Sequence, residues 1–204
     1  MVLKKENEIQ KIIQKLGPDL FQKIKEANKI ADIGCAHGVL LFLLHTKLEK
    51  PKEGLYGFDV SKKFIAEAKK NFKNIYYWNF NQKRKWPQKF DVIFALDVIE
   101  HLENPQIFLK NIHSLMKNGG FLVLSTPNIH SFSRFIQGSQ WFGFKDKTHK
   151  NFYCRASLFF LLKQEGLKIK KYKTLSSTTW PFYNWIISLF GLGGQVLLLA
   201  EKYD

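Results

Sequence analysis

Cysteine, acidic residues and uninterrupted apolar stretches are scarce in this chain. Its two cysteines, Cys35 and Cys154, lie in different local contexts, which argues against a disulfide framework and predicts a reducing, cytoplasmic environment. Residues 1–16 contain charges but no continuous apolar core and no small-residue cleavage site, so we expect neither a signal peptide nor a membrane anchor. The apolar segment near the C-terminus is interrupted by polar residues and glycines, so it predicts no membrane span.

Motifs of several other enzyme classes are also missing. The chain contains neither the G-x-S-x-G of serine hydrolases nor the G-x-x-x-x-G-K-[ST] loop that cradles phosphates. Its cysteines and histidines form no cluster with metal-ligand spacing. Asp146 and His149 are three residues apart, but no further ligands are apparent, so the sequence predicts no metal site.

Positive charge is what the chain has in excess. The 32 Lys and Arg residues against 17 Asp and Glu give a formal net charge of +15. Such a field favours anionic partners, among them nucleic acid, an anionic membrane or a phosphorylated substrate, although codon preference alone also produces lysine-rich surfaces. Hydrophobic residues make up 45% of the chain and aromatic residues 15%, which excludes a disordered chain and predicts one packed domain over residues 1–204.

The apolar periodicity alternates between that of helices and that of strands. Two N-terminal helices are expected within residues 1–28, the first at 3–16 and the second from Pro18. The elements expected after them are a strand at 29–33, a helix at 38–47, a strand at 54–59, a helix at 61–71, strands at 74–80 and 90–96, a helix at 104–117, a strand at 121–126, a helix leading into a sixth strand, and a final strand at 195–201. Short apolar strands separated by helices predict a mostly parallel α/β sheet with helices on both faces. Ligands of such sheets lie at the carboxyl ends of the strands.

The stretch "DIGCAHG" predicts a tight turn between the first strand and its helix. Its small residues fall at Gly34, Ala36 and Gly38, a G-x-A-x-G spacing, whereas a dinucleotide fold needs G-x-G-x-x-G beside a pyrophosphate. Asp32 is costly to bury unpaired, so we expect it to cap backbone N–H groups of the turn or to meet a cation. Asp59 ends the second strand, where a carboxylate accepts both hydroxyls of a ribose or, as the alternative, caps the next helix.

Together these stretches resemble the class I S-adenosylmethionine-dependent methyltransferases. "IADIGCAHG" is similar to the first motif of that family, with Ala36 in place of the middle glycine, and "LYGFDVS" is similar to its ribose-binding acidic motif. "FDVIFALDVIEHLENP" resembles the fourth-strand motif, and "LMKNGGFLVLSTPN" resembles the following helix, Gly-Gly turn and fifth strand. The resemblance covers residues 28–201, and it implies a Rossmann-like, mostly parallel seven-stranded sheet whose last strand is antiparallel.

The resemblance also implies the cofactor and the residues that hold it. The cofactor is expected to be S-adenosylmethionine, with S-adenosylhomocysteine as the product. Many members place an aspartate after the third strand to receive the adenine amino group. This chain has "WNFN" there, with Asn79 or, two residues on, Asn81 at that site, and an amide oxygen still accepts such a bond. The residues expected to hold the cofactor are Asp32, Gly34, Ala36, Gly38, Asp59, Val60, Asn79, Phe80 and Leu96.

Methyl transfer from a sulfonium is an in-line displacement, so it needs alignment of donor and acceptor but no covalent nucleophile. A hydroxyl acceptor benefits from a general base, and two of the six histidines stand at suitable places. His101 follows the carboxyl end of the fourth strand. His149 ends "KDKTH", which resembles a Thr-His pair that precedes the helix closing the acceptor site in ubiquinone-biosynthesis O-methyltransferases. A purely structural role is the alternative for each histidine.

Residues 129–149 place aromatic side chains between Gly, Ser and charged residues, without strand or long-helix periodicity. Long loops in compact domains are often lids or substrate walls, so we expect this segment, with one short helix, to close over the acceptor. Arg134, Trp141 and Phe142 are expected to line the acceptor pocket, with Arg134 holding an acidic group. A satellite aromatic cluster that only packs is the alternative.

The sequence therefore predicts a methyltransferase that acts on a small-molecule acceptor, at oxygen in the first place. Two alternatives stay open: an RNA methyltransferase that uses the basic surface, and a non-catalytic scaffold that retains the cofactor site. An aromatic-rich C-terminal segment beside a basic surface leaves peripheral membrane contact open as well. The acceptor, the oligomeric state and the choice between His101 and His149 as the base are not fixed by the sequence.

Overall fold

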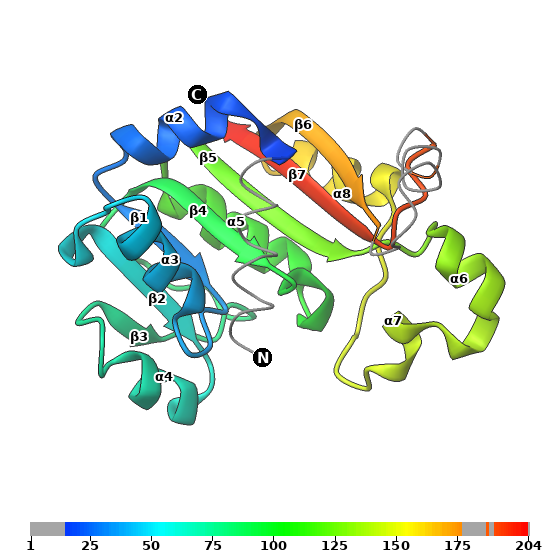
Figure 1. Cartoon of the computed structure of the whole chain (residues 1–204), viewed down its shortest axis with the longest axis horizontal. Helices are drawn as coiled ribbons and strands as arrows, with labels where there is room; N and C mark the ends of the chain where they lie inside the picture. Colours follow the sequence, from blue (N-terminus) through cyan, green and yellow to red (C-terminus); the bar gives the residue numbers. More distant parts are fainter. Residues whose placement is uncertain (1–14, 177–186, 188–189, 204) are drawn as a thin grey trace.

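The computed structural model describes residues 15–176, 187 and 190–203, and its centre is one twisted sheet with helices around it (Figure 1). Seven strands of the described residues lie in the order β3-β2-β1-β4-β5-β7-β6. The pairs from β3 to β5 are parallel, whereas β7 is antiparallel to both of its neighbours. The predicted α/β sheet, mostly parallel and with its last strand antiparallel, is confirmed. The strands are β1 (Ile30–Ile33), β2 (Leu55–Asp59), β3 (Ile75–Tyr77), β4 (Phe90–Leu96), β5 (Met116–Pro127), β6 (Leu167–Leu175) and β7 (Gln195–Lys202).

Strand order places the switch point of the sheet between β1 and β4. The chain runs outward from β1 to β2 and β3, and then returns to add β4 on the other side of β1. Connections leave β1 and β4 in opposite directions, and open α/β sheets bind their ligands at the carboxyl ends of two such strands. The helices are α2 (Pro18–Glu26), α3 (Val39–Lys47), α4 (Lys62–Ala68), α5 (Pro105–Leu115), α6 (Phe132–Gln137), α7 (Phe142–Lys145) and α8 (Arg155–Gln164), with 3-10 turns η1 (Lys52–Gly54), η2 (Ile99–His101) and η3 (Gly138–Gln140).

Two hydrophobic cores cover the two faces of the sheet. One core contains the apolar residues of α2, α3 and α4, and the other contains those of α5 and α8. All four residues of β1 are buried, as expected for a central strand that helices cover on both faces. For this reason β1 shows no alternation of buried and exposed residues along the strand.

Several element boundaries differ from the sequence prediction. The helix expected at 104–117 ends at Leu115, and β5 begins at Met116, which pairs with Phe90 before a register shift. The Gly-Gly turn thus becomes an irregular start of β5, in which Gly119 adopts a φ of 65°. The third strand stops at Tyr77, three residues short of its expected end. The helix expected at 3–16 lies almost entirely outside the described residues, as does the short helix expected before the final strand.

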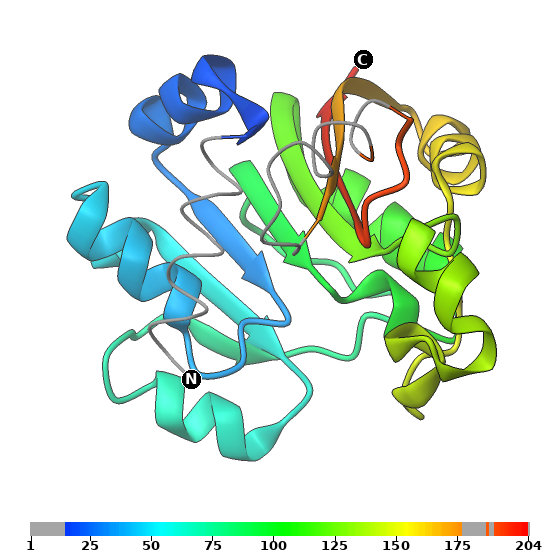
Figure 2. The same cartoon turned by 45° about the vertical axis from the view of Figure 1, so that its right-hand side comes forward.

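Residues 129–149, here called the lid segment, are more helical than the single short helix expected. They contain α6, η3 and α7, because Ser131 caps α6 by accepting the N–H of Arg134, and Gly138, with a φ of 53°, ends it. Figure 2 shows this segment beside the end of the sheet to which the arrows of β4 and β5 point. Among the residues that the structure describes, none of the helices has the length and apolar character that a membrane crossing requires.

Candidate active site

The turn after β1 is held by backbone hydrogen bonds to the neighbouring strand. The N–H groups of Gly34 and Cys35 both donate to the Phe58 carbonyl, at 2.8 and 3.1 Å. Gly34 has a φ of 74°, and a Cβ on it would approach a methyl carbon of Val98 to 2.7 Å, so only glycine fits without a shift. Ala36 occupies the left-handed region too, at a φ of 44°, which a side chain tolerates at some cost. The turn is therefore short and fixed.

Asp59, at the carboxyl end of β2, ties this turn to the start of α4. Its Oδ2 accepts the N–H of Ala36 at 2.9 Å, and its Oδ1 accepts the N–H of Ser61 at 2.8 Å. Ser61 itself caps α4, since its hydroxyl accepts the N–H of Phe64. A carboxylate offers about four acceptor positions, so each oxygen of Asp59 keeps one for a ligand. Both predicted roles, anchor of the helix start and acceptor for a diol, fit this geometry.

Asp32 lies in β1 in register with Gly57 and Phe94, and its side chain is buried. The Cys35 thiol lies nearby in the turn. Its burial, and then the negative charges of Asp32 and Asp59, raise the pKa of Cys35 above its ordinary value. Cys35 is therefore a neutral thiol. It packs against Gly57, where a Cβ would approach the Cys35 sulfur to 2.8 Å. Gly38 follows at the amino end of α3 with a φ of 79°.

The residues expected near an adenine ring divide between core and surface. Phe80 is buried and stacks on Trp78 at 4.5 Å, so its side chain belongs to the core, and only its backbone faces the end of β3. Asn81 accepts the N–H groups of Glu103 and Asn104 with one oxygen, which leaves it holding the loop before α5. Among the described residues, the side-chain oxygen of Asn79 accepts one N–H, that of Asn81. Of the two amides, Asn79 keeps more capacity for a ligand.

The other two predicted cofactor residues end their strands. Val60 follows Asp59 with 58% of its surface exposed, and Leu96, the last residue of β4, is partly buried against the core. Both stand at the carboxyl edge of the sheet, where their side chains can meet a ligand that lies across β1, β2 and β4.

A second group of residues joins the end of β4 to the end of the lid segment. The carbonyl of Glu100, in η2, accepts the N–H groups of Lys150 and Asn151 at 2.8 and 3.1 Å. The Asn151 amide donates to the carbonyl of Leu102 at 2.6 Å. These bonds connect positions almost fifty residues apart in the sequence, and they bring His149 beside His101, with ring centroids 4.8 Å apart.

Hydrogen bonds determine which nitrogen of each histidine carries a proton. Nδ1 of His149 lies 2.8 Å from the Gly143 carbonyl, which can only accept, so Nδ1 is the protonated nitrogen. The Thr148 hydroxyl donates its single hydrogen to Asp146 at 2.6 Å, and therefore accepts from Nδ1 of His101 at 2.9 Å. In the neutral form of each ring this leaves the lone pair on Nε2, which in His149 lies 3.6 Å from Oδ2 of Asp146. These two predicted histidines are brought together, each prepared to accept a proton.

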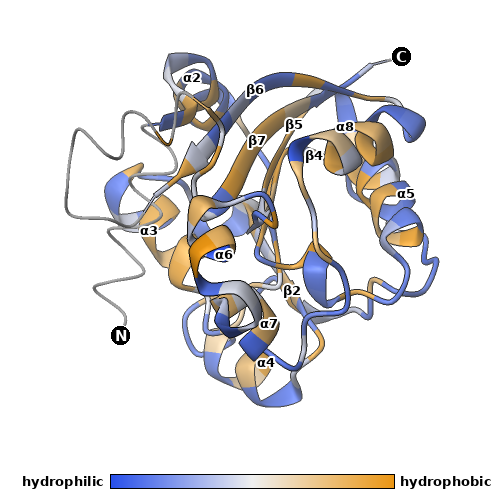
Figure 3. Cartoon of the chain, turned by 90° about the vertical axis from the view of Figure 1, so that its right-hand side faces the viewer, coloured by the Kyte–Doolittle hydropathy of each residue, from blue (hydrophilic) through white to orange (hydrophobic). Residues whose placement is uncertain are grey.

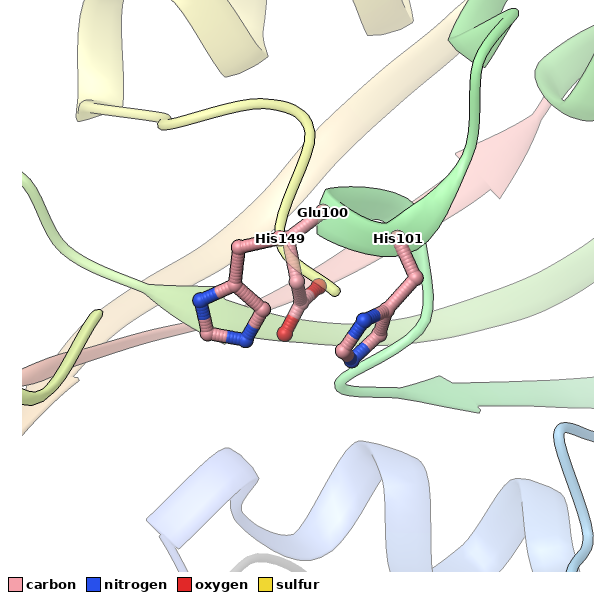
Figure 4. A group of neighbouring side chains, drawn as sticks. All are labelled: Glu100, His101 and His149. Atoms are coloured by element: carbon pink, nitrogen blue, oxygen red, sulfur yellow. The ribbon is translucent and has the colours of Figure 1, made fainter. Parts of the chain in front are cut away.

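Glu100 lies between the two imidazole rings, as Figure 4 shows. Its side chain is 1% exposed, Oε2 accepts the Thr126 hydroxyl at 3.0 Å, and Oε1 has no hydrogen-bond partner among the described residues. Burial, with the charge of Asp97 adding to it, raises the pKa of Glu100 to about 8. In the sequence, Glu100 is only one residue of the stretch "FDVIFALDVIEHLENP" that resembles the fourth-strand motif. The signal that could have found it is an acidic residue four positions after the end of a buried strand, next to a histidine.

Asp97 is a second residue that the sequence analysis missed. It follows β4 with a φ of 56°, and its Oδ1 accepts the hydroxyl of Ser125 at 2.8 Å and the amide of Gln195 at 2.6 Å. Aspartate is among the few residues that enter the left-handed region, and such backbone is concentrated at functional sites. Asp97 thus ties the ends of β4, β5 and β7 together.

The three lid residues expected to line an acceptor pocket have different positions. Trp141 is fully buried, with its ring 5.0 to 6.2 Å from those of Phe142, Phe144 and Phe152, so it forms the core of the lid segment. Phe142 is 49% exposed and is free to contact a ligand. The Arg134 guanidinium lies over the ring of Phe144, at 5.7 Å. The packing alternative thus fits Trp141, and the pocket role stays a prediction for the other two.

Solved structures share this arrangement of strands and helices. A magnesium protoporphyrin IX methyltransferase from Synechocystis with bound SAH has a TM-score of 0.68 and 18% identity, over 97% of this chain and 83% of that one. A SAM-dependent methyltransferase from Archaeoglobus fulgidus has a TM-score of 0.65 and 20% identity, over 97% and 94%. At such identity the likeness shows the fold alone.

Sequence relatives and a family model narrow the assignment. A tRNA U34 carboxymethyltransferase of Helicobacter acinonychis is 37% identical over 50% of this chain, but the match spans only 41% of that protein. A ubiquinone biosynthesis O-methyltransferase of Pelagibacter ubique is 29% identical over 70% of this chain and 62% of that protein. The family model described as a methyltransferase domain matches residues 4–172, which is most of the chain. The chain therefore belongs to this family: it is a class I S-adenosylmethionine-dependent methyltransferase.

Proposed function

We propose that the protein transfers a methyl group to a hydroxyl oxygen of a small molecule that lies between the carboxyl end of β4 and the lid segment. The observation that carries this proposal is the fixed tautomer of His101 and His149, because each ring keeps a basic Nε2. Methylation of a hydroxyl releases a proton, and an imidazole accepts a proton near neutral pH. An acceptor that is already a nucleophile would need no such pair.

The residues of the glycine turn fit the cofactor that the family uses. Asp59 keeps one acceptor position on each oxygen, which suits the two hydroxyls of a ribose, and Gly34 allows close approach of the backbone. Asp32, Ala36, Gly38, Val60, Asn79 and Leu96 complete the proposed set, with Phe80 acting through its backbone. When bound, S-adenosylmethionine supplies an electrophilic methyl group.

His149 is the stronger candidate for the base. Its side chain is 7% exposed, and its Nδ1 bond to the Gly143 carbonyl anchors the ring to the lid segment. His101 is connected through Thr148 to Asp146, a carboxylate whose pKa the Thr148 hydrogen bonds lower. The Thr148 hydroxyl thus orients His101 beside His149, where its ring can take part in proton transfer.

The exposed apolar side chains of the lid segment indicate what kind of molecule it contacts. Phe135, Ile136 and Phe142 are 77%, 66% and 49% exposed, and α6 contains hydrophobic stretches beside hydrophilic ones (Figure 3). Such surface favours an aromatic or alkyl-substituted acceptor. We therefore propose phenols with an apolar substituent as the acceptor class. The similarity to a ubiquinone biosynthesis O-methyltransferase of Pelagibacter supports methylation at oxygen.

The test is methyl incorporation from isotope-labelled S-adenosylmethionine into a panel of alkyl-substituted phenols, each with its O-methyl ether as the blank. For an accepted phenol, His149→Gln should lower kcat by about 100-fold or more, with little change in the KM for the cofactor. His130→Gln, which alters an exposed histidine outside the proposed set, is the matched control. Full activity of His149→Gln would contradict the base role.

RNA is the second candidate acceptor, because the net charge is +15 and a tRNA carboxymethyltransferase is among the relatives. Each phosphate contact would lower the logarithm of the binding constant by about 0.7 per decade of salt for a single strand. Binding of a transfer RNA that does not weaken with added salt would exclude a functional RNA site on this surface.

A further inference from the structure

Three side chains at the acceptor end of the site form a cluster of metal-ligand type. Glu100 and His101 come from η2, and His149 comes from the end of the lid segment, so two distant parts of the chain contribute. One possible ligand atom of each lies within 4.8 Å of those of the other two. One carboxylate and two imidazoles are a donor set that divalent first-row transition metals take in proteins.

The carboxyl group of this cluster is buried and only partly hydrogen-bonded among the described residues. Only 1% of the surface of Glu100 is exposed, and its Oε1 has no hydrogen-bond partner among the residues that the structure describes. An unpaired carboxylate oxygen is costly to bury, so the position is suited to a cation.

Both imidazoles are held in the tautomer that a metal requires. A metal-bound histidine usually donates its other ring N–H to a carbonyl or to a hydrogen-bonded polar group, which orients the ring. His149 does this with the Gly143 carbonyl, and His101 does it with the Thr148 hydroxyl, which in turn donates to Asp146. The two Nε2 lone pairs remain. Asp146 offers a fourth possible ligand, because its Oδ2 lies 3.6 Å from Nε2 of His149.

We propose that Glu100, His101 and His149 bind a divalent transition metal, Zn²⁺ in the first place, with a coordination position open toward the acceptor. Bonds of about 2.1 Å bring ligand atoms to a little over 3 Å apart, so the side chains need to move inward by about 1 Å. A metal here would bind the acceptor oxygen and lower the pKa of the acceptor hydroxyl. His149 would then serve as a metal ligand, and proton transfer to it would not be needed. The expected effect of the metal on turnover rests on the proposed function, whereas metal binding itself does not.

The experiment is a titration of chelator-treated protein with Zn²⁺ by calorimetry, and with Co²⁺ followed by its visible absorption. One equivalent should bind tightly, and Co²⁺ should show the intense bands of a low-coordinate site with nitrogen ligands. Glu100→Gln and His149→Gln should each weaken Zn²⁺ binding by about 100-fold or more, whereas His130→Gln should leave it unchanged. Glu100→Gln keeps the shape of the side chain, and a thermal melt of each variant verifies folding.

The outcomes separate this inference from the proposed function. Wild-type protein that binds S-adenosylhomocysteine but not one equivalent of Zn²⁺ would overturn the metal site and leave His149 as the base. Equal Zn²⁺ affinity of the wild type and Glu100→Gln would overturn it as well, since the metal would then lie elsewhere. Stoichiometric binding that depends on Glu100 and His149, in a protein that methylates no phenol, would support the site and contradict the proposed acceptor.

Discussion

The two ends of the site are held together by different kinds of contact. At the cofactor end, backbone groups of the turn after β1 bond to β2 and to Asp59, within thirty residues of sequence. At the acceptor end, His101 and His149 meet because the lid segment returns to η2 through side-chain and backbone bonds across almost fifty residues. The first end is local and depends on glycine, whereas the second depends on tertiary contacts.

This difference explains why one end is legible in the sequence. A turn that needs positive φ at Gly34 and Gly38, followed by a carboxylate at Asp59, leaves a pattern of fixed spacing. The acceptor end leaves no such spacing, because its partners come from separate segments. Loops of this kind vary in order to change specificity on a constant scaffold, so the two ends should respond separately to mutation.

The largest effect is expected at Gly34. In Gly34→Val the residue must keep a left-handed φ and also displace Val98, which together should cost about 2–5 kcal/mol of folding free energy. S-adenosylhomocysteine binding should fall below detection in calorimetry, because the turn can no longer reach β2. A variant that melts like the wild type and still binds would show that the turn is not the rigid element described here.

The core of the lid segment gives the next largest effect. Trp141→Ala removes a fully buried ring, and such truncations cost about 3–5 kcal/mol where the surroundings cannot collapse. The loss should be local, so hydrogen exchange should quicken over α6 and α7 while β1 and β2 stay protected. S-adenosylhomocysteine affinity should be retained. Equal loss of protection in β1 would mean that the two ends fold as one unit.

Thr148 should affect only the acceptor end. Thr148→Val keeps the shape but removes the hydroxyl that orients His101, so we expect kcat to fall by about tenfold and the pH profile of kcat to shift, with cofactor affinity unchanged. Thr148→Ser should restore both readouts, because it keeps the hydroxyl. A valine variant with the wild-type pH profile would assign Thr148 a purely structural role.

The smallest functional effect is expected at Asp91, which lies at the amino end of β4, whereas the site lies at the carboxyl ends of the strands. Burial alone would raise the pKa of this carboxyl, but bonds from Lys117 and from the N–H groups of Lys29 and Asn28 outweigh it and lower the pKa below the ordinary 3.8. A lowered pKa stabilises the fold above pH 3.8, and that stability is lost as the pH falls through the folded value.

Asp91→Asn should therefore destabilise the fold by about 1–2 kcal/mol at neutral pH and by less in acid. Chemical denaturation at a series of pH values measures this directly. Cofactor binding and turnover should both stay as in the wild type. A selective loss of one of them would break the separation of the two ends, since Asp91 is close to neither.

The sequence predicted the succession of helices and strands along the chain and the seven-stranded, mostly parallel sheet, but it did not predict the acceptor cluster. Buried strands such as β1 and the glycine turn leave local signals in spacing and hydropathy. The β5 start was placed too late, because tertiary pairing with Phe90 extends the strand through its glycines. Phe80 was assigned to the cofactor site from the family resemblance, and Trp141 to the acceptor pocket from the aromatic loop. Packing buries both side chains. Glu100 acquires its importance only when His149 arrives from a distant segment.

The central claim, that the cofactor end works independently of the acceptor end, is tested most directly by calorimetry with S-adenosylhomocysteine on three proteins. The wild type should bind in the micromolar range, Asp59→Ala should bind at least about tenfold more weakly, or about 1.4 kcal/mol, and His149→Gln should match the wild type. Equal weakening by the two substitutions would contradict the claim, and so would a wild type that shows no binding at all.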